Sequence, residues 1–208
     1  MNIRAVIFDL GGVVLGSPLH AIARFERDRS LRVGIVNEVV VATGPAGAWS
    51  RLERGELEPE AFFADFEAEC LAAGAQLDAR AMMKCMAEAA QPRPNMLEAV
   101  RRIRDRGLTA AALTNNWSGE EDGTRKLEPH FDVFVESSVV GLRKPDPRIY
   151  TYACEQIGVE PAQAVFLDDI GSNLKTARQL GMHTIKVDDP TAALVELQDV
   201  LGFSLALL

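Results

Sequence analysis

The chain has 208 residues, of which 48% are hydrophobic and 25% are charged, so it can bury a full core and is not expected to be disordered. Its formal net charge is -8 and its sequence pI is near 5.0, which excludes a general attraction for nucleic-acid phosphates. Because no stretch approaches about 18 uncharged apolar residues, a membrane partner is not expected either.

Cysteine usage indicates the compartment. Cys70, Cys85 and Cys154 are odd in number, widely spaced and without a CxxC pair, which favours neither a disulfide framework nor a zinc site. The first apolar run is too short for the core of a signal peptide and is broken by Asp9. We therefore expect a soluble protein of the reducing cytoplasm, as a monomer or a homodimer.

The first predicted strand covers residues 4–8 and ends at Asp9, which is followed by Gly11 and Gly12. A carboxylate is thereby delivered at the carboxyl end of a strand, where open α/β sheets place their chemistry, and the glycines let the chain turn behind it. An Asp in this position is by itself more often a turn or capping residue. Asp9 becomes a site candidate only if other segments supply matching groups.

A long helical region follows the first strand, because the next predicted strand begins only at residue 108. The gap is far longer than an ordinary crossover. We predict that residues 16–90 form a helical cap over the carboxyl edge of the sheet, and that residues 1–15 and 91–208 form the core domain, with the return hinge near Pro92. Within residues 59–71 one helix face is apolar and is interpreted as the core of the cap, rather than a pocket for an apolar substrate tail: Phe62, Phe63, Phe66 and Cys70.

Four further apolar runs predict strands at residues 108–113, 132–135, 164–167 and 184–187, and helical spacing predicts helices at residues 147–157 and 173–180. Alternation of strand and helix is typical of an α/β fold with a parallel sheet. The carboxyl ends of parallel strands meet at one edge, so the polar residues beyond them should converge with Asp9. These residues are Thr114 and Asn115, then Lys144, and then Asp168, Asp169 and Asn173.

The converging residue types suit phosphate chemistry. Carboxylate oxygens are the ligands that Mg²⁺ prefers, and a lysine with a hydroxyl can stabilise charge on a transferring phosphoryl group. Asp9 would then act as a nucleophile that forms an aspartyl-phosphate. The plainer alternatives are that Asp168 and Asp169 cap the following helix and that Lys144 is an ordinary surface lysine.

In order and spacing, these motifs resemble those of the haloacid dehalogenase-like (HAD) hydrolase superfamily. Residues 113–117, 140–147 and 166–174 are similar to the N-terminal phosphatase domain of soluble epoxide hydrolases, and a similar domain precedes some acyl-CoA dehydrogenase-like proteins. The resemblance covers essentially the whole chain. It implies a Rossmann-like α/β core with a parallel sheet and an inserted α-helical cap, a small phosphorylated molecule as ligand, and Mg²⁺ as cofactor.

The resemblance also implies individual roles. Asp9 would be the nucleophile, Thr114 and Asn115 would bind the phosphate, and Lys144 would be the orienting cation. In the cap, Trp49 and Arg51 would be candidates for substrate contact, through likeness to the cap loop of the epoxide hydrolase domain. The implied metal site consists of Asp9, the backbone carbonyl of Gly11, Asp169, and Asp168 and Asn173 as its supports.

Position 11 departs from the pattern of the resemblance, in which the residue two after the nucleophile is normally an Asp that serves as general acid and base. Gly11 can supply a carbonyl but no carboxyl. Positioned acid/base catalysis contributes roughly 10²- to 10⁴-fold, or about 3–5 kcal/mol of barrier, so its loss slows an enzyme without abolishing turnover. The leading hypothesis is therefore a Mg²⁺-dependent phosphatase of small phosphomonoesters.

Two alternatives stay open. The first is a catalytically silent module that binds a phosphorylated ligand, which the glycine at position 11 motivates. The second is a 2-haloacid dehalogenase, whose chemistry needs no metal, so that the adjacent carboxylates of Asp168 and Asp169 argue against it.

Overall fold

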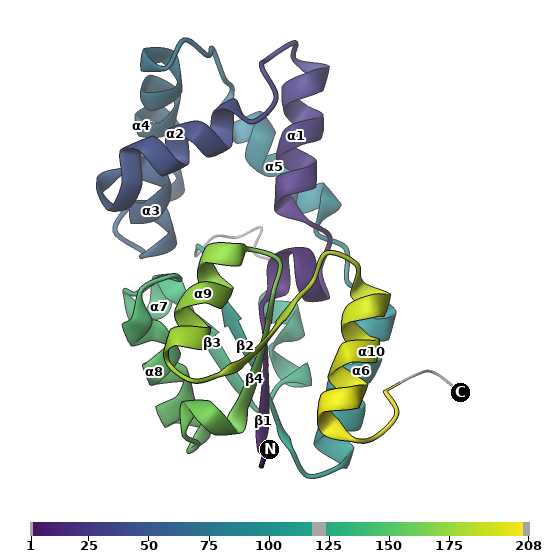
Figure 1. The fold of residues 1–208 in the computed structure, drawn as a ribbon. Helices are drawn as coiled ribbons and strands as arrows, with labels where there is room; N and C mark the ends of the chain where they lie inside the picture. Colours follow the sequence, from purple (N-terminus) through teal and green to yellow (C-terminus); the bar gives the residue numbers. More distant parts are fainter. Residues whose placement is uncertain (1, 118–123, 206–208) are drawn as a thin grey trace.

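The computed structural model describes residues 2–117 and 124–205. Its centre is a five-stranded sheet in the order β3-β2-β1-β4-β5, with every neighbouring pair parallel (Figure 1). The α/β fold and all five predicted strands are confirmed, with ends that lie within one residue of the prediction. The strands are β1 Ala5–Phe8, β2 Thr109–Thr114, β3 Val133–Glu136, β4 Ala164–Asp168 and β5 His183–Lys186.

Helices cover both faces of the sheet (Figure 1). Because side chains alternate along a strand, Val6 and Phe8 of β1 pack on one side with α6 (Pro94–Asp105) and α10 (Pro190–Leu201), while Ile7 packs on the other. That second face carries α8 (Pro147–Ile157) and α9 (Gly171–Gln179), in the places predicted. Shorter helical segments complete the core: α7 Ser137–Val140, η3 Arg125–His130 and η4 Pro161–Gln163.

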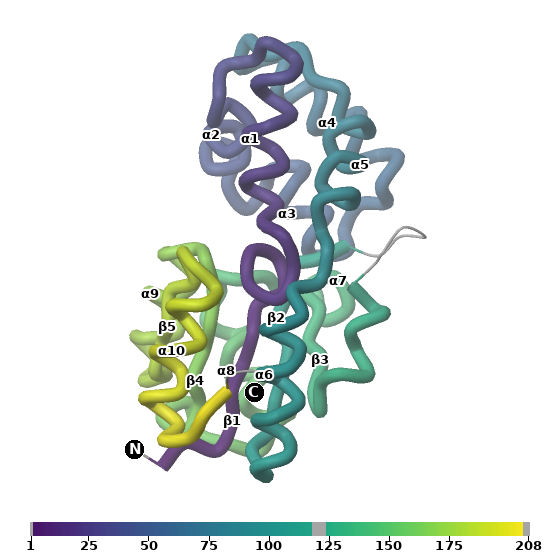
Figure 2. The backbone as a smooth tube through the Cα atoms, turned by 90° about the vertical axis from the view of Figure 1, so that its right-hand side faces the viewer, coloured from purple at the N-terminus to yellow at the C-terminus, as the bar shows by residue number. Residues whose placement is uncertain are grey.

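The helices between β1 and α6 form a second layer beyond the carboxyl ends of the strands (Figures 1 and 2). We call residues 18–89 the helical insert. It has a hydrophobic cluster of its own, separate from the two clusters that flank the sheet. Its elements are α1 Pro18–Asp28, α2 Ile35–Thr43, η2 Gly44–Ala46, α3 Ala48–Glu53, α4 Pro59–Ala72 and α5 Ala79–Ala89.

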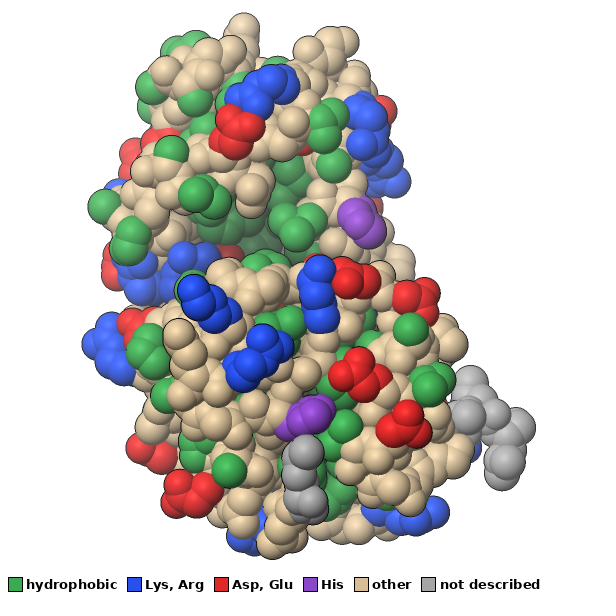
Figure 3. Space-filling model, in the orientation of Figure 1, with side chains coloured by type: hydrophobic (Ala, Val, Ile, Leu, Met, Phe, Trp, Pro, Cys, Tyr) green, Lys and Arg blue, Asp and Glu red, His purple; other side chains and the backbone are tan. Residues whose placement is uncertain are grey.

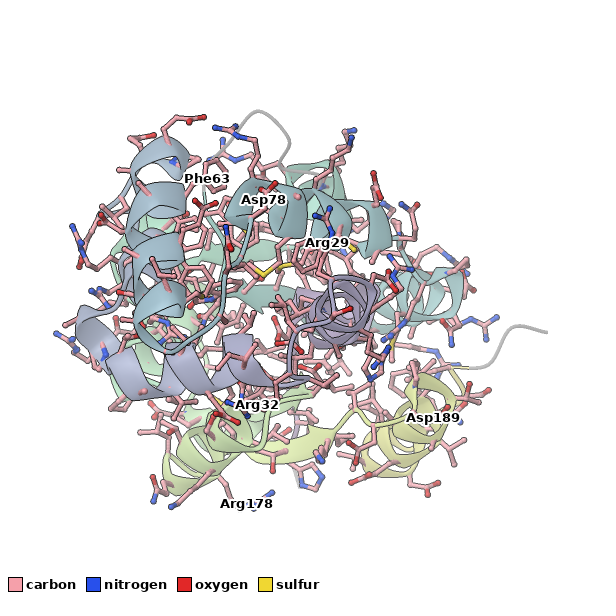
Figure 4. The ribbon with its side chains drawn as sticks, turned by 90° about the horizontal axis from the view of Figure 1, so that it is seen from above. Arg29, Arg32, Phe63, Asp78, Arg178 and Asp189 are labelled. Carbon is pink, nitrogen blue, oxygen red and sulfur yellow. The ribbon has the colours of Figure 1, made fainter. Side chains whose placement is uncertain are left out.

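The apolar face predicted for residues 59–71 is found on α4, with one difference. Phe62, Phe66 and Cys70 are 0%, 0% and 1% exposed within the cluster of the insert. Phe63 is only half-buried, and the Arg80 guanidinium of α5 lies 4.4 Å from the centre of its ring. Seen from above, Phe63 lies on the side of α4 that faces α5 (Figure 4). The helical spacing of the sequence correctly assigned Phe63 to this side of α4, but it could not show that the ring borders a cavity.

The chain passes between core and insert twice, and the two passages lie side by side (Figure 2). Leu15 and Pro92 form an antiparallel bridge, and the Arg93 N–H donates to the Val14 carbonyl over 2.9 Å. Gly16 allows this approach, because a Cβ there would lie 2.1 Å from the Ala89 carbonyl oxygen. Every helix within residues 2–117 and 124–205 is too short or too polar to span a membrane.

Candidate active site

The sheet brings the predicted site residues to one edge. In the register of the strands, Phe8 pairs with Ala112 of β2 and Leu167 of β4. Asp9 therefore follows β1 at the level of Asp168, the last residue of β4. Thr114 ends β2 on the other side of β1 and is 3% exposed.

Lys144 reaches this edge from the loop between α7 and α8. Its Nζ lies 2.8 Å from Asp9 Oδ1 and 2.8 Å from Asp168 Oδ2, and the residue is 1% exposed. Burial opposes the charge of the ammonium, but the two carboxylates outweigh burial and raise the pKa of Lys144 above its ordinary value. The side chain is thus held as a cation between the two carboxylates, and it is not a surface lysine.

Asp168 is fixed from behind. Asn173 Nδ2 donates to both of its carboxylate oxygens, over 3.1 and 3.0 Å, and the Ile170 N–H donates to Oδ1 over 2.7 Å. Asn173 is itself buried and accepts a hydrogen bond at its carbonyl from the Tyr150 hydroxyl. The geometry makes Asn173 a support of Asp168.

The carboxylates of Asp9, Asp168 and Asp169 fit a divalent cation. Each offers an oxygen that lies within 4.8 Å of the others, and clustered carboxylate oxygens are what Mg²⁺ prefers. Gly12 makes room for this arrangement, because a Cβ at that position would lie 2.1 Å from Asp169 Oδ2. The backbone of Gly12, at φ 79°, is also one that glycine tolerates best.

The electrostatics of the cluster point the same way. Burial raises the pKa of Asp169 to about 6 and holds the pKa of Asp9 well above its ordinary value, although the Lys144 ammonium lowers both. Lys144 balances one of the three negative charges, and a divalent cation would balance the other two. The donor set and the charge therefore both suit Mg²⁺.

The turn behind Asp9 is irregular and is held by Arg93, in the segment that returns from the insert to the core. Asp9 Oδ1 accepts from the Leu10 N–H over 2.7 Å at the start of η1 (Leu10–Val14). The Arg93 guanidinium donates to the carbonyls of Gly12 and Val13, the latter over 2.9 Å. A residue beside the hinge thus fixes the turn that carries the candidate nucleophile.

The side chain of Asn115 contacts the backbone of Lys144. Asn115 Oδ1 accepts from the Lys144 N–H over 2.8 Å, and its Nδ2 donates to the Lys144 carbonyl over 3.0 Å. The amide that the resemblance assigns to phosphate binding is therefore occupied in tying two loops together. Its contact with a phosphate stays a prediction.

A cavity of about 570 Å³ opens between the insert and the core. On the core side it is bounded by Gly11, Thr114 and Asn115, while Asp9 and Lys144, 6% and 1% exposed, are not among its lining residues. The hollow between the layers and its hydrophobic lining are visible in Figure 3. The apolar wall includes Trp49, Phe62, Phe63, Met83, Met86 and Trp117.

Of the two insert residues singled out for substrate contact, the structure brings only Trp49 to the cavity. Arg51 is not among the lining residues, and its Nη1 lies 3.2 Å from Asp65 Oδ2, with the arginine side chain 38% exposed. The ion pair is internal to the insert. Arg51 is therefore apart from the other site candidates, and its role in binding stays a prediction.

Sequence reasoning missed Glu53 and Arg143. Glu53 of α3 lines the cavity, and its Oε2 lies 2.5 Å from Arg143 Nε, so a carboxylate of the insert contacts the core beside Lys144. The only local signal was that Arg143 directly precedes Lys144. The two partners are 90 residues apart in the chain, so no spacing rule could pair them.

The sequence is similar to known proteins along nearly its whole length. Residues 3–181 match the family model described as haloacid dehalogenase-like hydrolase. The chain is 38% identical over 209 residues to acyl-CoA dehydrogenase family member 10 of Mus musculus, covering 98% of this chain and 20% of that protein. It is 36% identical to bifunctional epoxide hydrolase 2 of Sus scrofa, covering 99% and 40%. The chain thus spans well under half the length of these two relatives. A sesquiterpene phosphatase of Aspergillus oryzae is 25% identical over 96% of this chain and 97% of its own length.

Solved structures share the fold. A protein from Porphyromonas gingivalis, described as a predicted HAD-like family hydrolase, aligns with a TM-score of 0.68 at 22% identity, over 97% of this chain and 98% of that one. A HAD family enzyme from Bacteroides thetaiotaomicron, solved in complex with magnesium and inorganic phosphate, aligns with a TM-score of 0.59 at 19% identity, over 88% and 93%. With a family model matched over most of the chain and relatives above 30% identity along its length, the chain belongs to the haloacid dehalogenase-like hydrolase family.

Proposed function

We propose that the chain is a Mg²⁺-dependent phosphatase of small phosphomonoesters that works through an aspartyl-phosphate on Asp9. The observation that carries the proposal is the buried cluster in which Lys144 lies 2.8 Å from both Asp9 and Asp168, with Asp169 close enough to share a cation. Phosphatase-named relatives and a fold neighbour solved with magnesium and phosphate support the choice of chemistry.

The contacts of Asp9 suggest which atom attacks. Oδ1 accepts from the Leu10 N–H and from Lys144, so Oδ2 would be the oxygen that attacks phosphorus. The bond from phosphorus to the ester oxygen breaks as the new bond forms, and its electron pair leaves with the alcohol oxygen. Lys144 and the Thr114 hydroxyl would donate to the phosphoryl oxygens as charge shifts onto them.

The second half of the reaction returns the enzyme to its starting state. Water attacks the phosphorus of the aspartyl-phosphate, releases inorganic phosphate and restores the carboxylate of Asp9. Asp168 would position the Lys144 ammonium through both steps, because Asn173 and the Ile170 N–H hold its carboxylate still.

Mg²⁺ when bound would supply the positive charge that lets an anionic nucleophile approach an anionic phosphate. Asp9, Asp169 and the Gly11 carbonyl would hold the ion, with Asp168 and Asn173 as supports. The fit rests on the clustered oxygens and on the space that Gly12 leaves for Asp169.

The cavity favours a substrate with an apolar group next to its phosphate. Trp49 and Phe62 of the insert face a volume of about 570 Å³ that reaches Thr114, and an apolar group buried there gains roughly 25 cal/mol for each Å² removed from water. The insert would serve as a cap that excludes bulk water during the reaction.

We place the protein in the reducing cytoplasm, which agrees with the free thiols of its three cysteines.

The test is a screen of small phosphomonoesters for phosphate release, with Mg²⁺ and with a chelator, run on the parent protein and on Asp9→Asn. The proposal expects release that depends on Mg²⁺ and is lost in the variant, because the amide cannot act as a nucleophile. Equal release by the variant and the parent would count decisively against it.

Gly11 motivates a second candidate, a silent module that binds a phosphorylated ligand without turning it over. It would show ligand-induced thermal stabilisation and no phosphate release with any member of the screen. The third candidate, a 2-haloacid dehalogenase, has less support, since that chemistry has no use for the acidic cluster. Chloride release unaffected by a chelator would favour it.

A further inference from the structure

The insert touches the core at a second place, away from the hinge, where α3 lies over α7 (Figure 1). The backbones approach closely here, because a Cβ on Gly55, at φ 69°, would lie 2.5 Å from the Ser138 carbonyl oxygen. Glu53 of this contact also lines the cavity, so the contact lies at the edge of the cavity.

An ion pair is the polar centre of this contact. Glu53 Oε2 lies 2.5 Å from Arg143 Nε, and Arg143 Nη1 donates to Ser50 Oγ over 3.1 Å. The other oxygen of Glu53 accepts from the Trp49 indole N–H over 3.0 Å. The side chains of Glu53 and Arg143 are 9% and 24% exposed, so the pair is largely shielded from solvent. Loss of one member would leave a charge without its partner.

Two routes connect this ion pair to Lys144. Arg143 is the residue before Lys144, so its position constrains the peptide between them. Asn115 provides the second route, because its Nδ2 lies 3.5 Å from Glu53 Oε2 and also donates to the Lys144 carbonyl. Its Oδ1 accepts from the Lys144 N–H. The side chain of Asn115 thus links Glu53 to the backbone of Lys144.

We propose that Glu53 and Arg143 are positioning residues, through which docking of the insert fixes the peptide of Lys144 and so places the ammonium between its two carboxylates. Enclosure of the cavity and completion of the charged site then occur together. The effect on the Lys144 peptide is a property of the fold, whereas its consequence for turnover rests on the proposed function.

The first test does not depend on catalytic activity. Amide hydrogen exchange is measured for residues 141–144 in the parent, in Glu53→Gln and in Arg143→Met. The matched control is Arg54→Met, which removes an ion pair from the same end of α3, where Arg54 Nε lies 2.6 Å from Glu56 Oε1 within the insert. We expect exchange of the Lys144 amide to rise roughly tenfold in both test variants, since a tenfold change needs about 1.4 kcal/mol, and to stay unchanged in the control. Unchanged exchange in folded test variants would overturn the proposal.

The second test asks whether the pair acts as a unit in turnover. Glu53→Gln and Arg143→Met should each lower kcat for a phosphomonoester by roughly tenfold, and the double variant should be no worse than either single one. A purely structural role predicts a lower thermal midpoint with kcat unchanged below it, and this result or additive losses would contradict the proposal. If the parent releases no phosphate from any ester, the proposed function fails, while the exchange measurement still decides this inference.

Discussion

Replacing Gly11 with Asp should speed the hydrolysis of alkyl phosphates. Gly11 lines the cavity beside Thr114 and has φ −64° and ψ 126°, a backbone conformation open to any residue. An added Cβ would lie 3.2 Å from Cδ and Cγ of Pro18, so the proline ring must move by a few tenths of an ångström. Gly11→Asn incurs the same displacement, so the difference between the two variants isolates the carboxyl group.

The size of the gain follows from what a positioned acid contributes. An alkoxide is a poor leaving group and benefits from a proton in the transition state, which is worth roughly 10²- to 10⁴-fold, or about 3–5 kcal/mol of barrier. A phenolate leaves more easily, so transfer of the phosphoryl group from an aryl phosphate to Asp9 should gain much less. The parent should accordingly hydrolyse aryl phosphates far faster than alkyl phosphates of similar size.

The assay measures kcat/KM, which reports phosphoryl transfer to Asp9, for one alkyl and one aryl phosphate at saturating Mg²⁺. It is run on the parent, Gly11→Asp and Gly11→Asn, after thermal unfolding has shown that all three are folded. We expect Gly11→Asp to exceed Gly11→Asn on the alkyl ester by at least about 10². Equal rates for the two variants would refute the reasoning, as would a parent that treats both esters alike.

Three further predictions concern the charged cluster. Lys144→Met should lower the free energy of unfolding by about 3–5 kcal/mol in urea titrations, because it leaves two buried carboxylates facing each other, whereas the exposed Lys175→Met should not. In the metal-free protein the folded-state pKa of Asp169 is about 6, above the ordinary 3.8. Between these two pH values the folded protein holds a proton that the unfolded chain has lost, so the free energy of unfolding should fall as pH rises. Added Mg²⁺ should then raise the thermal midpoint more at about pH 7.5 than at about pH 5, and an equal rise would contradict the assignment. Gly12→Ala should weaken Mg²⁺ binding in calorimetry by displacing Asp169, while Gly34→Ala, with φ 92° and nothing within 4 Å, should not.

Much of the fold was predictable because it depends on local pattern. Apolar runs identified the five strands, and the rule that parallel strands end at one edge predicted that Asp9, Lys144 and Asp168 lie together, as the structure has them. The family resemblance implied roles for these residues and showed that position 11 departs from the family pattern, neither of which sequence spacing alone gives.

The side-chain contacts across the cavity were not predictable. Glu53 and Arg143 meet only because the insert folds back over the core, and their separation along the chain leaves no periodic signal. The amide of Asn115 was expected to face a phosphate, but the loop that carries Lys144 passes close enough to occupy it. Such contacts depend on the packing of two layers, which no single helix or strand pattern encodes.

The most direct measurement of the central claim is mass spectrometry of the protein quenched in acid during turnover of an aryl phosphate with Mg²⁺. We expect a phosphoryl group on the peptide that contains Asp9, and we expect it to accumulate, because position 11 offers no carboxylate to activate the attacking water. Hydroxylamine should remove the group, and Asp9→Asn should never acquire it. Sustained phosphate release with this peptide unmodified throughout would contradict the account.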